Sequence, residues 1–571
     1  MKRLLLFLLL IACLSASISA AADFNKFFVC DQIQNAVEVY DATGLKRISS
    51  FKTGPKPARI VNNPHNGGYI LMYRGAKNTP GGLTFLNSIY KTTGSKKLPG
   101  IVVQDFYLKD SGLWLLFTVA SDKKITVSNL ICYDLKNQET NTIPLNGPPA
   151  VYRFNEDRTE LAVGTLGNSE KKVPAELVLI DLLQNKVRSF PVSANPGAIF
   201  NTASGKIAVA CGGFRNSQRY PSKLLLETTD NAEFAKLHWI DPVTGETEVT
   251  TLGYSPLLID QDRDDPDTFY AVCANVYGDP NEEQRGITLG SVFNPDLDRP
   301  AATFYKITSA QIEAALELQN QPGRLIQASS GTVCLQGESD LYIIDVSGLV
   351  PKLLDYKHDK SIDQFLINND GTIGYLSNSN SNYLNIIDLK TGKEIKTLKI
   401  SDSFYIGKLF LNFFGSGFPP VIQPDSVKPI TTTNPSENLR MFFSQDGSVL
   451  YILAGAPEVC VVDLQTNTVK SVIKFNDTQY GIHPTPDGKR IVVAAENGWH
   501  LLDPSRTKPE FSLAFSLEET EQGPENGYYS PNGDLLVIPF KNYLYLIDPI
   551  RGVSLGKTRT KAIAPLIVWP E

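Results

Sequence analysis

Residues 383–392 read Tyr-Leu-Asn-Ile-Ile-Asp-Leu-Lys-Thr-Gly, and this phrase decides the fold because it recurs along the chain. It is a short alternating apolar run that ends in Asp388 and continues into a turn with Gly392. Aspartate can cap such a turn with a side-chain oxygen, and glycine adopts the positive φ that turns require. Comparable phrases end at Asp41, Asp134, Asp181, Asp241, Asp345, Asp463, Asp503 and Asp548, with weaker copies at 83–87 and 303–307. We therefore expect these aspartates to be turn residues at strand ends rather than catalytic groups.

A second phrase precedes most of these copies and predicts a β-hairpin. In its clearest form Asp487-Gly488 is followed by Lys-Arg-Ile-Val-Val-Ala-Ala. Asn-Gly and Asp-Gly between alternating apolar residues are strong short-range hairpin signals. Equivalent dipeptides stand at 66–67, 370–371, 446–447 and 532–533. Each unit is therefore predicted to be a four-stranded antiparallel meander that ends in the aspartate turn and one further strand.

The spacing of the units indicates a β-propeller. From Asp41 to Asp548 the chain advances 507 residues, which corresponds to about 10–11 units of ~46 residues. Four-stranded units of this size are typical of propeller blades. The copies at 383–393 and 455–495, with the link Gly-Pro-Lys-Pro-Ala-Arg-Ile at 54–60, resemble the YVTN-type β-propeller repeat. This resemblance implies an all-β propeller fold and covers surface-layer, periplasmic and lactonase-like proteins.

The number of units leaves two arrangements open. One ring usually holds about 4–8 blades, so two rings are the favoured arrangement and one outsized ring is the alternative. The N-terminal strand at 27–30 and the C-terminal strand at 564–570 are expected to close a ring by sharing a sheet. The run Ser-Ala-Gln-Ile-Glu-Ala-Ala-Leu-Glu-Leu-Gln-Asn at 309–320 predicts a helix. The predicted domains are a signal peptide at 1–22, repeats at 23–308, a helical linker or insertion at 309–325 and repeats at 326–571.

The N-terminus predicts export. Lys2 and Arg3 precede an apolar run at 4–12, and Ala20-Ala21-Ala22 forms a small-residue cleavage site. We therefore expect a secreted or periplasmic protein. The alternative is lipidation at Cys13, because Leu-Ile-Ala-Cys at 10–13 resembles a lipobox, and the protein would then be anchored to the membrane.

Composition limits the class of partner. The formal net charge is −6, which argues against nucleic acid. Six cysteines follow the predicted signal peptide without any Cys-x-x-Cys pair, which excludes zinc-ribbon and thioredoxin-like motifs. Most of these cysteines fall inside apolar strands, so we expect buried thiols. No sequence motif requires a cofactor.

One acidic segment suggests a calcium site. Alternate carboxylates in a tight loop present several oxygens to one point, which suits Ca²⁺. The same segment takes the place that an Asn-Gly or Asp-Gly hairpin fills elsewhere, so an enlarged hairpin is the other interpretation. The candidate ligands are Asp260, Asp262, Asp264, Asp265 and Asp267.

Residues 401–436 interrupt the repeat with an aromatic segment followed by a Pro/Thr-rich run. Insertions on one face of a propeller often form a binding surface. A degenerate blade is the other interpretation. The candidate partner-binding residues are Phe410, Phe413, Phe414 and Phe418.

The sequence therefore predicts an exported, non-catalytic β-propeller that binds a protein or another ligand of the cell envelope. No Gly-x-Ser-x-Gly, His-Glu-x-x-His, P-loop or dinucleotide-binding motif occurs. Two alternatives stay open. One is a lactonase-like hydrolase with carboxylates at a channel mouth, and the other is a structural repeat protein of the cell surface.

Overall fold

The computed structural model is all-β, as the sequence predicts. The part of the chain that it describes contains 44 strands and no helix. No helix in this part of the chain is long and apolar enough to cross a membrane. The described residues are 26–77, 79–122, 125–166, 174–212, 234–274, 302–328, 331–337, 340–358, 362–378, 383–400, 441–444, 446–453, 458–474, 479–485, 490–495, 498–502, 511–516, 527–540, 542–551, 553–563 and 565–570.

The strands form eleven four-stranded sheets in two compact units. Unit 1 contains the described residues within Met1–Pro144 and His483–Glu571, and unit 2 those within Leu145–Lys428 and Asn438–Ile482. Antiparallel four-stranded meanders of this kind are the blades of a β-propeller. Residues 309–325 lie within unit 2.

Unit 1 holds five of the sheets, apart from residues 479–482 at the start of β36, which belong to unit 2. The strand order is β3-β2-β1-β44 in the first sheet and sequence order in the others. The strands of the first three sheets are β1 (Lys26–Asp31), β2 (Ala36–Asp41), β3 (Lys46–Lys52), β44 (Pro565–Val568), β4 (Pro57–Asn63), β5 (Gly68–Tyr73), β6 (Gly82–Leu86), β7 (Thr92–Lys97), β8 (Ile101–Leu108), β9 (Leu113–Asp122), β10 (Ile125–Asp134) and β11 (Glu139–Leu145). The strands of the other two are β36 (Gln479–Pro484), β37 (Ile491–Ala495), β38 (Gly498–Leu502), β39 (Phe511–Ser516), β40 (Tyr528–Tyr529), β41 (Leu536–Phe540), β42 (Tyr543–Asp548) and β43 (Val553–Arg559).

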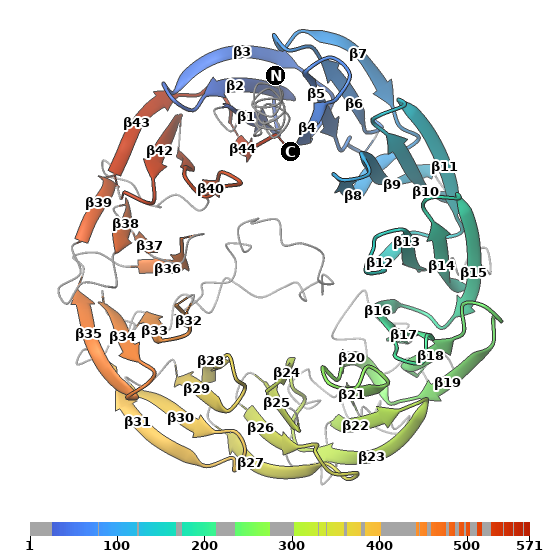
Figure 1. The fold of residues 1–571 in the computed structure, drawn as a ribbon, viewed down its shortest axis with the longest axis vertical. Helices are drawn as coiled ribbons and strands as arrows, with labels where there is room; N and C mark the ends of the chain where they lie inside the picture. The colour runs from blue at the N-terminus through green and yellow to red at the C-terminus, as the bar shows by residue number, and fades with distance from the viewer. Residues whose placement is uncertain are drawn as a thin grey trace, which may run out of the picture. The chain divides into compact units, whose positions relative to one another are not determined.

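Unit 2 holds six sheets, each in sequence order. Figure 1 shows their first strands on the inner side of an arc and their fourth strands on its outer side. The strands of the first three sheets are β12 (Pro149–Phe154), β13 (Glu160–Thr165), β14 (Ala175–Asp181), β15 (Lys186–Val192), β16 (Pro196–Asn201), β17 (Ile207–Cys211), β18 (Lys236–Ile240), β19 (Thr247–Thr251), β20 (Tyr254–Gln261), β21 (Thr268–Ala274), β22 (Ala302–Thr308) and β23 (Gln311–Leu318). The strands of the other three are β24 (Arg324–Gln327), β25 (Thr332–Gln336), β26 (Asp340–Asp345), β27 (Lys352–His358), β28 (Ile362–Ile367), β29 (Ile373–Asn378), β30 (Tyr383–Asp388), β31 (Glu394–Lys399), β32 (Met441–Phe443), β33 (Val449–Leu453), β34 (Glu458–Asp463) and β35 (Thr468–Lys474).

The aspartate turns form as predicted wherever they are described. Asp134 accepts hydrogen bonds from the backbone N–H groups of Lys136 (2.7 Å) and Asn137 (3.1 Å). These hydrogen bonds satisfy backbone donors at the turn between the third and fourth strands. The same side-chain-to-backbone bonding occurs at Asp41, Asp181, Asp241, Asp345, Asp388, Asp463 and Asp548, whereas Asp503 lies outside the described residues.

The hairpin signals at 66–67, 370–371, 446–447 and 532–533 are confirmed too, because glycine supplies the positive φ there, whereas Asp487-Gly488 lies outside the described residues. Gly67 has φ +61° and Gly371 has φ +74°. A side chain with a Cβ atom rarely adopts this left-handed conformation. The weaker copies at 83–87 and 303–307 are likewise third strands, β6 and β22.

An apolar layer joins neighbouring sheets within each unit. Phe28 and Val39 of the first sheet pack with Ile60 and Leu71 of the second, for example. Trp114 and Trp239 are fully or almost fully buried in two further layers. The six cysteines of the described chain are buried, one in each of six sheets, which confirms the prediction of buried thiols.

The predicted helix at 309–320 is wrong. Residues Gln311–Leu318 form strand β23, which pairs with β22. Ser309 and Ala310 have φ +48° and +69° and make the hairpin between the two strands. Ala, Leu, Glu and Gln favour a helix locally, but pairing with β22 and burial of alternate residues outweigh this weak preference. The segment is the fourth strand of a blade, not a helical linker.

The two ends of the described chain share one sheet, as predicted. Strand β44 pairs antiparallel with β1, with Phe28 opposite Val568 and Cys30 opposite Leu566. The C-terminal strand therefore supplies the fourth strand of the N-terminal sheet and covers the edge of β1. The predicted number of rings stays a prediction.

Candidate functional site

The aspartates of the predicted calcium site lie in and beside the hairpin between β20 and β21, and most of them bond to protein groups. Asp260 accepts a hydrogen bond from Gln327 Nε2 (2.7 Å), and burial raises the pKa of its carboxyl. Asp262 caps the turn by accepting from the backbone N–H groups of Asp264 (2.8 Å) and Asp265 (3.0 Å). Its other oxygen accepts from the Tyr270 hydroxyl.

The remaining aspartates of this hairpin diverge. Asp265 accepts from the Thr268 hydroxyl (2.7 Å), whereas Asp267 accepts from the hydroxyl of Ser204 (3.1 Å) in the neighbouring sheet. Asp264 is exposed. Among the described residues, no three or more His, Cys, Asp or Glu side chains are grouped so that they could hold a metal ion. These residues form an enlarged hairpin, which is the interpretation that we favour, and calcium binding stays the alternative prediction.

Two further predicted sites cannot be placed. The aromatic residues Phe410, Phe413, Phe414 and Phe418 lie outside the described residues, as does the alternative lipidation site Cys13. Their roles stay predictions.

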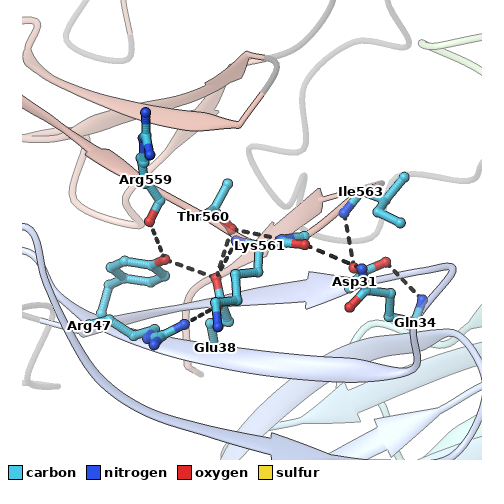
Figure 2. Close-up of polar contacts among 10 residues, drawn as sticks. Asp31, Gln34, Glu38, Arg47, Arg559, Thr560, Lys561 and Ile563 are labelled. Carbon is cyan, nitrogen blue, oxygen red and sulfur yellow. Dashed lines mark hydrogen bonds and ion pairs between the residues drawn. The ribbon is translucent and has the colours of Figure 1, made fainter.

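A buried carboxylate that the sequence reading missed joins the C-terminal link to the first sheet (Figure 2). Glu38 of β2 is 6% exposed. Its carboxylate accepts hydrogen bonds from Thr560 Oγ1 (2.7 Å), Tyr40 Oη (2.9 Å) and Arg47 (2.7 Å). Burial alone would raise the pKa of Glu38, but the hydrogen bonds from Thr560, Arg47 and Tyr40 outweigh burial and lower it.

A second carboxylate holds the same C-terminal link, and we call the two carboxylates together with the link the C-terminal clasp. Asp31, at the end of β1, accepts from the backbone N–H of Ile563 (2.9 Å) through one oxygen. Its other oxygen caps the β1–β2 turn at Ile33 and Gln34 (2.9 and 3.0 Å). The C-terminal clasp, Asp31 and Glu38 with residues 559–563, therefore fixes the link that leads into β44.

Another buried carboxylate bridges two sheets. Asp105 of β8 pairs with Arg59 of β4 (2.8 Å) and accepts from Trp114 Nε1 (3.1 Å). Asp105 is 9% exposed, so its charge needs these partners. Like Asp260 and Asp267, it connects its own sheet to a neighbour.

The exposed charges gather differently, on three outer strands of unit 1. Strands β43, β3 and β7 are the fourth or outermost strands of consecutive sheets, as Figure 1 shows. Together they carry seven basic residues and no acidic residue. We call this surface the basic rim: Lys46, Arg47 and Lys52 of β3, Lys96 and Lys97 of β7, and Lys557 and Arg559 of β43.

Several cations of the basic rim are held in place by neighbouring groups. Lys557 Nζ lies 5.2 Å from the centre of the Tyr543 ring, and the Arg559 guanidinium lies 5.6 Å from it. Lys96 Nζ lies 5.5 Å from the Tyr133 ring. Cation–π contacts of this kind orient a charge while leaving it accessible. The basic rim has a signal in the sequence, because each of its three strands directly follows the turn at the end of a predicted third strand.

Comparisons with known proteins find only distant structural likenesses. No family model matches the chain, and no curated protein matches it. The dihydro-heme d1 dehydrogenase NirN is 12% identical, with 96% of this chain and 76% of that chain covered at a TM-score of 0.32. A eukaryotic initiation factor is 11% identical (78% and 95% covered, TM-score 0.36), and the C-terminal WD40 domain of Sif2 is 12% identical (70% and 94% covered, TM-score 0.31). The eleven four-stranded antiparallel sheets of the described residues are propeller blades, so the chain is a β-propeller protein, and its likeness to the YVTN-type repeat stays a prediction.

Proposed function

We propose that this protein is an exported, non-catalytic β-propeller that binds a partner in the cell envelope. The observation that carries the proposal is the use of its buried carboxylates. Glu38, Asp105 and Asp260 each accept hydrogen bonds from a neighbouring sheet or from the link to it. Carboxylates bound in this way hold neighbouring parts of the scaffold together, which supports a structural rather than a catalytic use of these groups.

The aspartates of the repeat have the same kind of role. Hydrogen bonds from the turn lower the pKa of Asp41, Asp241 and Asp463. A carboxylate with a lowered pKa is a weaker base than usual, which suits a cap and not general-base catalysis. The chemistry of the described chain therefore supports a rigid frame that presents an accessible surface.

The sequence features at 1–22 support export. Lys2, Arg3, the apolar run at 4–12 and Ala20–Ala22 form the pattern of a secretory signal. The proposal places the mature protein in the periplasm or outside the cell. Lipidation at Cys13 is the alternative, and the intact mass of the mature chain distinguishes a lipidated N-terminus from cleavage near residue 22.

The test uses the purified mature chain and washed envelope fractions of the organism that produces it. We expect saturable sedimentation with the envelope fraction and none with the soluble fraction. In parallel, a panel of aliphatic and aromatic lactones is incubated with the same preparation. Absence of envelope binding, or lactone turnover above the rate in buffer, would overturn the proposal.

A further inference from the structure

We propose that the basic rim binds a linear anionic polysaccharide, which names the class of envelope partner and so rests on the proposed function. The first argument is charge. The 20 residues of β43, β3 and β7 carry seven positive charges and no negative charge, and within the part of the chain that the structure describes only Arg47 among the seven is offset, by the Glu38 carboxylate, whereas the whole chain has a net charge of −6. A local field of this sign attracts anions to one surface of a protein that otherwise repels them.

Protection of the sheet edges does not account for this charge. Lysine on an outermost strand discourages pairing with other chains, but a charge of either sign can do so. Among the outer strands of unit 2, β19 and β23 carry Glu248, Glu313 and Glu317 and no basic residue, whereas β15 and β35 carry two basic residues each and no acidic residue. Since this position in the blade accepts charges of either sign, three consecutive sheets whose outer strands are all basic need another reason.

The backbone of the basic rim argues against addition of a peptide strand. A register shift leaves one residue unpaired in each strand: Ile48 in β3, Thr93 in β7 and Leu555 in β43. Such β-bulges interrupt the ladder that an added strand would continue. An anionic partner is therefore bound by side chains.

The side chains between the cations favour a carbohydrate. Hydroxyl groups interleave with the basic residues at seven positions: Ser49, Ser50, Thr92, Thr93, Ser95, Ser554 and Thr558. Serine and threonine hydroxyls can donate to and accept from sugar hydroxyls, and to sulfate or carboxylate groups they can donate. The larger apolar side chains on these strands are fewer, namely Ile48, Phe51, Val553 and Leu555. A lipid surface would favour the reverse proportion, because binding there scales with buried apolar area.

The extent of the basic rim favours a polymer. Its cations come from three consecutive sheets that share apolar layers. The strands β43, β3 and β7 follow one another along the outer side of unit 1 (Figure 1). One small anion would meet only one of these strands, whereas an extended chain can meet all three.

The test compares dextran sulfate with uncharged dextran of the same length, so that only the charge differs. Binding to the full mature chain is measured by calorimetry at low and high salt. We expect dextran sulfate to bind, dextran not to bind, and the affinity to fall as NaCl rises, since exposed charges are screened. The variant Lys46→Gln/Lys52→Gln/Lys97→Gln removes three exposed cations and is expected to bind about tenfold more weakly or worse.

A matched control separates location from net charge. The variant Lys186→Gln/Lys352→Gln/Lys470→Gln removes three exposed lysines from outer strands of unit 2. It is expected to bind within about twofold of the original protein if the basic rim is the site. Equal loss in both triple variants, or no binding of dextran sulfate, would overturn the inference. Stronger binding to phosphatidylglycerol vesicles or to single-stranded DNA would also overturn it.

The failure of this inference and the failure of the proposed function are distinguishable. If the original protein and the rim variant sediment equally with envelope fractions, the basic rim is not the site and the proposed function stands. If neither protein sediments, the proposed function fails, whatever dextran sulfate does.

Discussion

The Thr560 hydroxyl donates a hydrogen bond of 2.7 Å to Glu38, a residue 522 positions earlier in the chain. Glu38 lies in the first sheet, and Thr560 lies in the link between β43 and β44. This contact is part of the C-terminal clasp, and it sets the path of the chain into the strand that completes the N-terminal sheet.

Replacement of Glu38 by Gln should lower the free energy of unfolding by about 1–3 kcal/mol, because the buried amide cannot satisfy the same donors. Thr560→Val should cost less, and the double variant should cost less than the sum of the two. Urea unfolding of the four proteins measures the coupling. The control is Glu160→Gln, which breaks the more exposed ion pair with Arg188 and should change stability by under about 1 kcal/mol. Equal effects of Glu38→Gln and Glu160→Gln would contradict the clasp.

Stability should fall in acid. A lowered pKa means that the folded state favours the carboxylate, so the stabilisation is present above the unfolded pKa and is lost as pH falls. This holds for Glu38, whose pKa is lowered from 4.5, and for Asp446, whose pKa is lowered from 3.8 to about 2. The urea midpoint should change little between about pH 5 and 7 and should fall from about pH 4.5 towards pH 2. In the Glu38→Gln variant the urea midpoint should fall less at low pH. If the variant shows the same dependence of the midpoint on pH as the original protein, Glu38 does not contribute to the loss of stability in acid.

The six cysteines of the described chain should resist thiol reagents in the folded protein. All are buried, and burial raises the pKa of Cys132, Cys273 and Cys460 to about 12. A protonated, inaccessible thiol reacts slowly. We expect no release of thionitrobenzoate from Ellman's reagent under native conditions and six equivalents from the mature chain in denaturant. Rapid reaction of any thiol in the native protein would show that its strand opens.

Calcium should have little effect on this protein. Asp262 and Asp265 already accept hydrogen bonds from the loop, and Asp267 accepts from Ser204. We therefore expect the melting temperature to be the same in calcium and in chelator. A calcium-dependent rise that disappears in Asp262→Ala/Asp264→Ala would show that the hairpin binds the ion.

The repeat was predictable from the sequence because its signals are local. An aspartate such as Asp388 and a glycine such as Gly371 determine their turns through contacts within a few residues. The sharing of a sheet by both ends was predictable for a related reason. The first unit lacks a first strand, and Pro565–Val568 has the pattern of that strand.

What could not be predicted depends on contacts between distant residues. The segment Gln311–Leu318 has helix-favouring side chains and becomes a strand because β22 pairs with it. The hydrogen bond from Thr560 to Glu38 and the ion pair between Arg59 and Asp105 join residues that are distant in the sequence, and they form only when the chain has folded. The basic residues of the rim can be read from the sequence of each strand. Their cations are recognised as neighbours only once β43, β3 and β7 are known to be outer strands of consecutive sheets.

The central claim is that the two ends of the described chain share one sheet, and one engineered disulfide tests it most directly. Cys30 lies opposite Leu566, and Leu566 packs in the same apolar layer. Opposed residues of antiparallel strands are close enough for a disulfide. In the Leu566→Cys variant the introduced thiol should therefore form a disulfide with Cys30 when the protein refolds under oxidising conditions, detected by peptide mass mapping. The control Ile567→Cys places its thiol on the other face of the sheet and should not form one. No disulfide in Leu566→Cys, or equal yields in the two variants, would contradict the pairing of β44 with β1.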